Sequence, residues 1–372
     1  MRIGVPREVK NNEFRVAITP AGAHDLVEHG HQVLVETGAG GGSSIPDEAY
    51  AEAGATLVPD ADAVWGDADV VMKVKEPIES EYRHFRPGLV LFAYLHLAAE
   101  ADLTRALARS GVTAIAYETV QLPSRVLPLL APMSEVAGRL APLVGANAML
   151  KPNGGPGLLM PGVPGTRPAK VVVLGGGVAG ANATSVSVGL GADVTVLDTN
   201  LQRLVELDAL YAGRIKTLAS SAYAIERAVL DADLVIGSVL VPGARAPKLV
   251  SNALVSRMLP GSVLVDIAVD QGGCFEDSHP TTHADPTFRV HGSLFYCVAN
   301  MPGAVPATST YALTNATLPY VRALAAHGWR DALAADPAFA LGLNVHDGSV
   351  VNDAVAAAHG LDHARLDAVL TG

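Results

Sequence analysis

Cysteine and aromatic side chains are scarce in this sequence of 372 residues, which contains two cysteines and only 5% Phe, Trp and Tyr. The two cysteines, Cys274 and Cys297, are not spaced as metal ligands are. So few thiols in a long chain are typical of a reducing compartment, and we therefore expect a cytoplasmic protein.

Positive charge is also in short supply. The net charge is −11, and no run of five or more Lys and Arg residues offsets the acidic balance. Binding to nucleic acid requires a basic surface, so we expect no nucleic-acid partner.

Signal-like apolar segments are missing as well. The first ten residues, MRIGVPREVK, carry charges at positions 2, 7, 8 and 10 and have no apolar signal core. Residues 171–192 contain no charge and are long enough to cross a bilayer. Their six glycines and several small polar residues instead favour a buried strand, a turn and a helix. We expect neither secretion nor a membrane span.

Apolar residues make up 49% of the chain, and short β-branched runs alternate with longer helical stretches. This alternation predicts an α/β fold built on doubly wound parallel sheets, and the length suits two domains. In the first series the predicted strands are residues 2–6, 32–37, 70–75, 89–95 and 112–118, and the predicted helices are 19–30, capped by Gly30, and 46–55. In the second series the predicted strands are residues 169–177, 192–198, 232–240, 262–270 and 295–300.

A predicted helix over residues 133–150 separates the two series. Ser134 is its expected N-cap, and Pro142 is expected to kink it. From about residue 307 the chain is rich in alanine and is expected to be mostly helical.

The stretch VVVLGGGVAGANA places Gly175, Gly177 and Gly180 in a G-x-G-x-x-G pattern directly after a hydrophobic strand. Glycines at this spacing permit a tight turn and bring the backbone close to a pyrophosphate at a helix N-terminus. The next predicted strand ends in Asp198, where a carboxylate binds the adenosine ribose hydroxyls and repels a 2′-phosphate. A structural turn beside a surface aspartate is the alternative. The surrounding strands and helix favour a Rossmann-type site for NAD rather than NADP.

Three polar side chains stand where mostly apolar strands are predicted to finish, namely Lys75, His96 and Asp270. Ligands of open parallel sheets bind beyond the carboxyl ends of the strands. A lysine there can hold a carboxylate or carbonyl oxygen, a histidine can exchange protons, and an aspartate can activate water or stabilise a cation. Each also has a structural alternative, as an edge charge, a partly buried imidazole and a turn former. Together with a nucleotide motif they favour an active site, whereas Asp266, inside the apolar run, is expected to be structural.

Arg15 poses a similar choice. It follows Phe14 and precedes the apolar run Val16–Ile18. Such an arginine is either a solvated edge charge or is directed inward at an anion, and its neighbours in the sequence do not decide between the two.

Several long stretches resemble the alanine dehydrogenase family, whose members interconvert L-alanine with pyruvate and ammonia using NAD. They span almost the whole chain, and they are MRIGVPREVKNNEFRVAITPAG, KVKEP, LHLAA, PLLAPMSEVAGRLA, VLGGGVAG, VLVDIAVDQGGCFE, CVANMPGAVPATSTYALTNATLPY and HGW.

The resemblance implies that Arg15 and Lys75 bind the substrate and that His96 and Asp270 are catalytic. It also implies further cofactor contacts along the second series of strands. Together with the glycine turn, the implied cofactor residues are Ser134, Gly175, Gly177, Val178, Ala179, Gly180, Asp198, Arg203, Ser220, Val239, Leu240, Ile267, Ala268, Val269, Asp270, His279, Val298, Ala299, Asn300 and Met301.

The same resemblance implies a discontinuous substrate domain, made of residues 1–128 and 307–372, around a Rossmann domain of residues 129–306. It also implies a homohexamer and small-molecule substrates: L-alanine, pyruvate and ammonium. The alternatives are the NAD-binding subunit of a proton-translocating transhydrogenase and, more distantly, a saccharopine-type dehydrogenase. Lys75, His96 and the stretch APMSEVAGRLAP favour an alanine dehydrogenase over these alternatives.

Two positions depart from the family pattern. His279 stands where relatives often have an arginine near the cofactor, which predicts a weaker electrostatic contact to NAD. Ala323 stands four residues before His327, where some relatives have a carboxylate that binds a metal, so no metal is expected.

Overall fold

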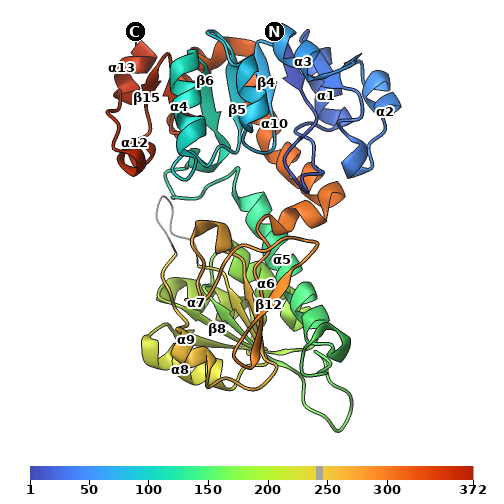
Figure 1. Ribbon diagram of the computed structural model, residues 1–372, viewed down its shortest axis with the longest axis vertical. Coiled ribbons are helices and arrows are strands. Elements are labelled where there is room, and N and C mark those ends of the chain that lie inside the picture. Colours follow the sequence, from blue (N-terminus) through green and yellow to red (C-terminus); the bar gives the residue numbers. More distant parts are fainter. Residues whose placement is uncertain (240–245, 372) are drawn as a thin grey trace. The chain divides into compact units, whose positions relative to one another are not determined.

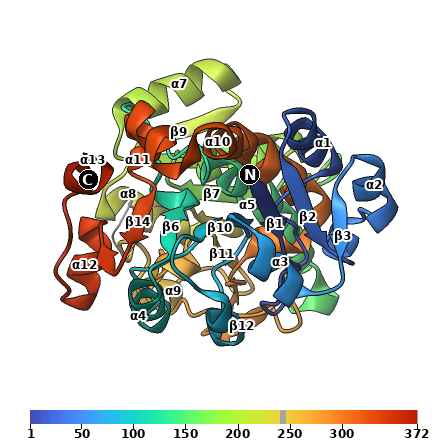
Figure 2. The same ribbon diagram turned by 90° about the horizontal axis from the view of Figure 1, so that it is seen from above.

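The structure is a computed structural model that describes residues 1–239 and 246–371. The chain forms two compact units (Figure 1). One contains residues 1–133 and 305–372, and the other contains residues 134–304. Each unit has a mainly parallel sheet covered by helices (Figure 2), so the α/β prediction is confirmed.

The first unit is built on an eight-stranded sheet with the order β15-β14-β6-β5-β4-β1-β2-β3. The first six strands of the chain pair in parallel, whereas β14 and β15 add an antiparallel edge. The strands are β1 Arg2–Val5, β2 Gln32–Glu36, β3 Thr56–Val58, β4 Val70–Met72, β5 Val90–Ala93, β6 Thr113–Ala116, β14 Leu343–His346 and β15 Ser349–Val350.

Eight helices of the described chain belong wholly to this unit: α1 Pro20–Glu28, α2 Asp47–Glu52, α3 Ala61–Asp67, α4 Ala101–Ser110, α10 Pro306–Ala335, α11 Pro337–Ala340, α12 Asp353–His359 and α13 Leu366–Thr371. Helix α1 shows why the chain turns helical where it does. The Thr19 hydroxyl accepts the N–H of Gly22, Pro20 occupies the first turn, and Gly30 follows the last turn with φ of 81°. The predicted cap at Gly30 is confirmed.

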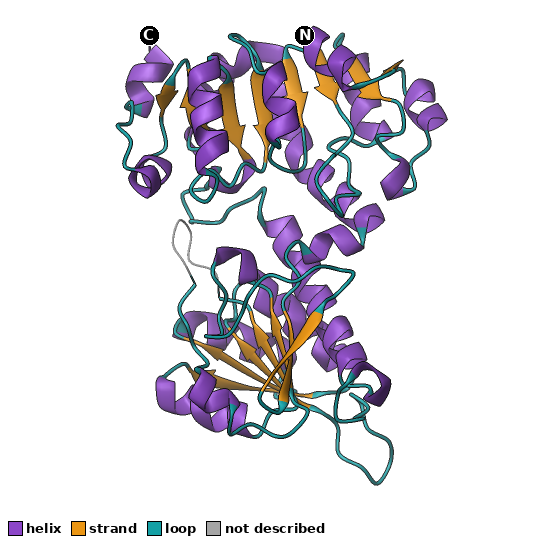
Figure 3. Ribbon diagram, in the orientation of Figure 1, coloured by secondary structure: helices purple, strands orange, loops and turns teal. Residues whose placement is uncertain are grey.

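The second unit has a seven-stranded sheet with the order β12-β13-β11-β10-β7-β8-β9. Figure 3 shows its strands fanned out between helices. All pairs are parallel except β12 with β13. Its strands are β7 Lys170–Leu174, β8 Asp193–Asp198, β9 Ile215–Ala219, β10 Leu234–Gly237, β11 Val263–Asp266, β12 Thr287–Val290 and β13 Ser293–Tyr296. Its helices are α6 Val178–Gly189, α7 Leu201–Tyr211, α8 Ala222–Leu230 and α9 Asn252–Val255.

Strand β7 is buried on both faces, which is why it reads as a continuous apolar run. Val171 and Val173 pack in one core cluster, and Val172 and Leu174 pack in another. Covering both faces excludes water from the sheet and leaves its carboxyl edge as the place for ligands.

Helix α5, Ala131–Ala148, begins earlier than predicted. The N–H of Ala131 bonds to the Leu127 carbonyl, so the helix has already started when the chain reaches Ser134. The predicted N-cap at Ser134 is therefore wrong. The helix continues through Pro142.

Several predicted strands end early or are shifted, three of them in the following way. Residues 70–75 and 262–270 shorten to β4 and β11, and the strand expected at 295–300 lies at 293–296. The chain leaves β11 at Asp266 because that buried carboxylate gathers backbone N–H groups around itself. Residues 14–18 form no strand, and the mostly helical C-terminal segment also contains β14 and β15.

Across the described residues, no helix combines the length and apolar character that a membrane crossing requires.

Candidate active site

The predicted cofactor residues follow the carboxyl ends of neighbouring strands in the second unit. The glycine turn follows β7, which lies between β8 and β10. Because all these strands are parallel, their ends meet at one edge of the sheet. In the order of the chain, the edge carries Gly175–Gly180, Asp198, Ser220, Val239, Ile267–Asp270 and Val298–Met301.

The glycine turn is held by close contacts at Gly175 and Gly180. Gly175 has φ of 98°, which L side chains rarely adopt. A Cβ on Gly180 would lie 1.8 Å from the Gly175 carbonyl oxygen and 2.7 Å from Oγ of Ser238. Ser238, which sequence reasoning missed, donates to the carbonyls of Leu174 and Gly175. The turn is thus rigid before any ligand binds.

Asp198 and Arg203 hold the middle of the same turn. Oδ2 of Asp198 accepts the N–H of Gly176 at 2.6 Å, and Nε of Arg203 donates to the Gly176 carbonyl at 2.6 Å. Space around Gly177, the N-cap of α6, is open: a Cβ there would meet no atom within 4 Å. An anion could approach the helix N-terminus at that point.

Residues 267–270 lie on a loop organised by Asp266. Its fully buried carboxylate accepts the N–H groups of Ala268, Cys274 and Phe275 and the hydroxyl of Ser278. Burial raises the pKa of Asp266, and these donors oppose the rise. Asp270 lies in a short 3-10 turn, Val269–Gln271, beyond β11 rather than at the strand end itself.

The remaining predicted contacts are placed as follows. The N–H of Ser220 bonds to the Asp198 carbonyl, and the imidazole of His279 stacks on Phe288 with 3.8 Å between ring centroids. Ser134 lies in the first turns of α5, and Asn300 has φ of 67°. Leu240 lies outside the described residues.

This edge fits a dinucleotide. It offers a preformed glycine turn, an open helix N-terminus and a carboxylate at the end of the second strand, which are the features that receive pyrophosphate and ribose.

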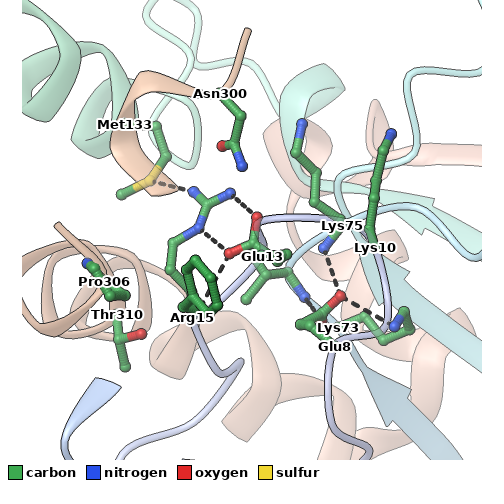
Figure 4. Close-up of polar contacts among 12 residues, drawn as sticks. Glu8, Lys10, Glu13, Arg15, Lys73, Lys75, Met133, Asn300, Pro306 and Thr310 are labelled. Atoms are coloured by element: carbon green, nitrogen blue, oxygen red, sulfur yellow. Dashed lines mark hydrogen bonds and ion pairs between the residues drawn. The ribbon is translucent and has the colours of Figure 1, made fainter. Parts of the chain in front are cut away.

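In the first unit, Arg15 is not a solvated edge charge, because only 2% of it is exposed. Glu13 accepts its Nε and Nη2 protons, each at 2.6 Å, and Nη1 lies 3.0 Å from Sδ of Met133 (Figure 4). Burial disfavours the charged guanidinium, but Glu13 outweighs it and the pKa of Arg15 is raised. The Nε edge of the guanidinium is therefore engaged by Glu13, and Nη1 is in contact with Met133.

Lys75 and His96 come together just beyond β4 and β5. Nζ of Lys75 lies 3.4 Å from Nε2 of His96, whose side chain is 33% exposed. Burial, then Lys75, Lys10 and Arg15, lower the pKa of His96 to about 3. The imidazole is thus neutral at physiological pH, with the ammonium of Lys75 beside Nε2 and the Glu76 carboxylate 4.0 Å from the same nitrogen.

A carboxylate holds the backbone at each of these two strand ends, and sequence reasoning missed both. Glu8 accepts the N–H groups of Val74 and Lys75, and Glu118 accepts those of Leu95 and His96. Burial raises the pKa of both carboxyl groups.

Beneath this pair lies a buried ion cluster that was also missed. Lys73, 1% exposed, lies 3.1 Å from Glu8 and 2.9 Å from Glu81. Removing one partner of such a cluster leaves a buried charge uncompensated. The available signal was the density of Glu and Lys in REVKNNE and KVKEPIESE, in a chain with only 17% charged residues.

The structure therefore brings Lys75 and His96 together, with Arg15 close enough to influence the imidazole, while Asp270 belongs to the second unit. Cys274 and Cys297 are buried, and burial raises the pKa of each thiol to about 12. In the part of the chain that the structure describes, no group of three or more His, Cys, Asp or Glu residues is placed to hold a metal ion.

Two family models together match most of the chain. The N-terminal domain of the alanine dehydrogenase/PNT family matches residues 4–137, and its C-terminal domain matches residues 141–353. The chain belongs to this family.

Among its relatives, the alanine dehydrogenase of Mycobacterium tuberculosis (strain CDC 1551 / Oshkosh) is 60% identical over 370 residues, which cover 100% of both chains. A solved L-alanine dehydrogenase is 52% identical and superposes with a TM-score of 0.94 over 97% of this chain and 99% of that one. A solved transhydrogenase from Sinorhizobium meliloti is 27% identical, with a TM-score of 0.81 over 95% of this chain and 100% of that one.

Proposed function

We propose that this chain catalyses the reversible oxidative deamination of L-alanine to pyruvate and ammonium, with NAD as the hydride carrier. The observation that carries the proposal is the contact between Lys75 and His96. A cation and a neutral imidazole lie 3.4 Å apart at adjoining strand ends, in a chain that also has a dinucleotide-binding edge. A 2-oxo acid needs these two groups: a cation for its oxygens and a neutral base for the proton transfers.

Lys75 and Arg15 hold the small anionic substrate. Lys75 reaches the carbonyl oxygen beside His96, and the buried guanidinium of Arg15, whose charge Glu13 maintains, attracts the carboxylate. Fixing the substrate in this way means that the entropy of orienting it is lost on binding rather than in the transition state. This lowers the activation free energy substantially.

The cofactor is held by the carboxyl edge of the second sheet. The open N-terminus of α6 receives the pyrophosphate, and Asp198 receives the ribose hydroxyls and disfavours a 2′-phosphate. When bound, the nicotinamide supplies the hydride acceptor for alanine and the hydride donor for the reverse reaction.

In this scheme His96 transfers protons and Asp270 stabilises positive charge on the substrate. As alanine is oxidised, its amine becomes a cationic iminium, and the carboxylate of Asp270 stabilises that charge. His96 takes a proton from the water that adds to the iminium carbon, which gives a carbinolamine, and returns that proton to the amine. The C–N bond then breaks, and His96 accepts the remaining hydroxyl proton as the carbonyl of pyruvate forms and ammonia departs. Lys75 stabilises charge in this scheme and forms no covalent bond with the substrate, so borohydride should trap no pyruvate–Lys75 adduct.

The decisive experiment follows NADH absorbance with the purified chain, pyruvate and ammonium. We expect NADH to be consumed catalytically and only when both substrates are present. No consumption would favour the alternative, a nucleotide-binding subunit of a transhydrogenase. Glyoxylate and larger 2-oxo acids, assayed in parallel, would define the substrate range.

The assembly and its setting belong to the same proposal. We place the protein in the cytoplasm as a homohexamer whose substrate domain comprises residues 1–128 and 307–372 and whose Rossmann domain comprises residues 129–306. Light scattering on the purified chain tests the hexamer, because a mass well below six chains would contradict it.

A further inference from the structure

The backbone of His96 adopts a conformation that its side chain does not favour. Its φ is 50°, in the left-handed region that suits glycine. A non-glycine residue persists there when neighbouring groups fix it, and such residues concentrate at functional sites. Something must therefore hold the chain at this point.

The sheet register brings Glu118 to the place where this support is needed. Strands β5 and β6 run parallel, with Ala93 opposite Ala116. Beyond these strand ends, Glu118 lies in the short 3-10 turn Tyr117–Thr119 and its carboxylate reaches the backbone of Leu95 and His96. Oε1 of Glu118 accepts the N–H of His96 at 2.7 Å and that of Leu95 at 3.2 Å, and Oε2 lies 3.3 Å from the Leu95 nitrogen.

The orientation of the imidazole depends on this backbone. His96 has only two side-chain torsions, so its ring direction follows its φ and ψ closely. The ring stacks on Tyr94, with 6.0 Å between centroids and 13° between planes, and its Nε2 faces Lys75. Rotating the backbone out of the left-handed region would move the ring away from both neighbours.

We propose that Glu118 is a positioning residue for catalysis: its carboxylate holds the left-handed backbone of His96 and thereby directs the imidazole at the substrate. The inference rests on the proposed role of His96 as the proton-transfer group. Glu8 holds the end of β4 in a similar way, but the long flexible stem of Lys75 can compensate for small backbone shifts. The side chain of His96 has only two torsions and cannot compensate, so its backbone must be fixed more precisely than that of Lys75.

The test compares Glu118→Ala, which removes the acceptor, with Glu118→Gln, whose amide oxygen can still accept both N–H groups. Asp336→Ala is the matched control, because Oδ1 of Asp336 also accepts two backbone N–H groups, those of Ala338 and Phe339, at a helix start in the same unit. Each variant is assayed for kcat, for the KM of NADH, and for the rate at which diethyl pyrocarbonate acylates His96, read by peptide mass spectrometry.

For Glu118→Ala we expect kcat to fall at least tenfold, with the KM of NADH within twofold of wild type and the acylation rate of His96 changed at least threefold. Glu118→Gln should restore kcat to within about threefold, and Asp336→Ala should change neither kcat nor acylation. Wild-type kcat in folded Glu118→Ala would overturn the proposal. So would a Gln variant as defective as Ala, because charge rather than hydrogen bonding would then matter.

If Glu118→Ala fails to fold, Glu118→Asp replaces it. The shorter side chain keeps the charge but withdraws the oxygens from the N–H groups, so kcat should again fall, and wild-type kcat would overturn the proposal. An inactive wild-type chain would instead contradict the proposed function, and the acylation rate would still report whether Glu118 sets the state of His96.

Discussion

Nζ of Lys75 lies 3.4 Å from Nε2 of His96. A cation this close disfavours the imidazolium, and together with burial it lowers the pKa of His96 to about 3. An imidazole held neutral in this way can accept a proton only when its surroundings change. A bound carboxylate, which offsets the nearby cations, supplies that change.

Replacing Lys75 by Met should therefore raise the pKa of His96 towards its usual value of 6.5. The sign follows from removing a like charge, and adding pyruvate to the wild-type chain should move the pKa in the same direction. The pH dependence of His96 acylation by diethyl pyrocarbonate measures both effects. An unchanged profile in folded Lys75→Met would show that burial alone sets the pKa.

Stability in acid should also depend on His96. Because its pKa is about 3 in the folded chain and about 6.5 when unfolded, the unfolded state binds more protons between these pH values. The free energy of unfolding should thus fall as the pH drops through this window. Urea unfolding of wild type and His96→Asn at pH 7 and pH 5 should show a smaller loss in the variant, and equal losses would contradict the lowered pKa.

Arg15→Lys should raise the pyruvate KM while leaving the affinity for NADH little changed. A lysine keeps one charge but cannot serve Glu13 through two nitrogens and also face a ligand. The buried Glu13 carboxylate then loses a donor, so the melting temperature should fall as well. Steady-state kinetics and thermal unfolding test the two effects, and an unchanged pyruvate KM would remove Arg15 from the substrate site.

Asp198→Gly should shift the cofactor preference towards NADPH by about tenfold or more in kcat/KM, because the charge that repels a 2′-phosphate is gone. The variant also loses the acceptor for the Gly176 N–H, so activity with NADH should fall. Asp208→Asn, an exposed charge removal on α7, is the control. A preference unchanged in Asp198→Gly would contradict the ribose assignment.

Gly180→Ala should destabilise the chain and abolish NADH binding. The added methyl would lie 1.8 Å from the Gly175 carbonyl oxygen, so the glycine turn must move, at a cost of about 2 kcal/mol or more. Gly189→Ala, near the end of the same helix and with no atom within 4 Å of its Cβ, should be neutral or slightly stabilising. Calorimetric NADH titration and thermal unfolding of both variants test the contrast.

Much of the fold followed from patterns that act locally. The strand before Gly175, the glycine turn and the strand ending at Asp198 were predictable because hydrophobic runs and glycine spacing act over a few residues. The placement of Lys75 and His96 near strand ends was predictable for the same reason. The predicted N-cap at Ser134 was wrong because a bond from Ala131 to Leu127 starts the helix earlier.

The rest depended on partners distant in the sequence. Glu118 accepts the N–H of His96 because the pairing of β5 with β6 brings the ends of these two strands together. No local pattern reveals which carboxylate will accept which backbone N–H. The pairing of Arg15 with Glu13 is local in the sequence. Whether this pair is a surface or a buried one depends on the packing of the whole folded unit. Strands β14 and β15 are too short to stand out in an alanine-rich helical segment.

Strand β14 pairs with β6, although the whole second unit separates them in the chain. During synthesis at about 5–20 residues per second, β6 leaves the ribosome on the order of ten seconds or more before its partner exists. Helix α10, whose Thr310 accepts the N–H of Val16, is also made late. The segment that carries Arg15 therefore waits until residue 310 has been made, whereas residues 134–304 contain all the strands of their own sheet. The second unit can fold on the nascent chain, and the first unit is completed only after helix α10 and strands β14 and β15 have emerged.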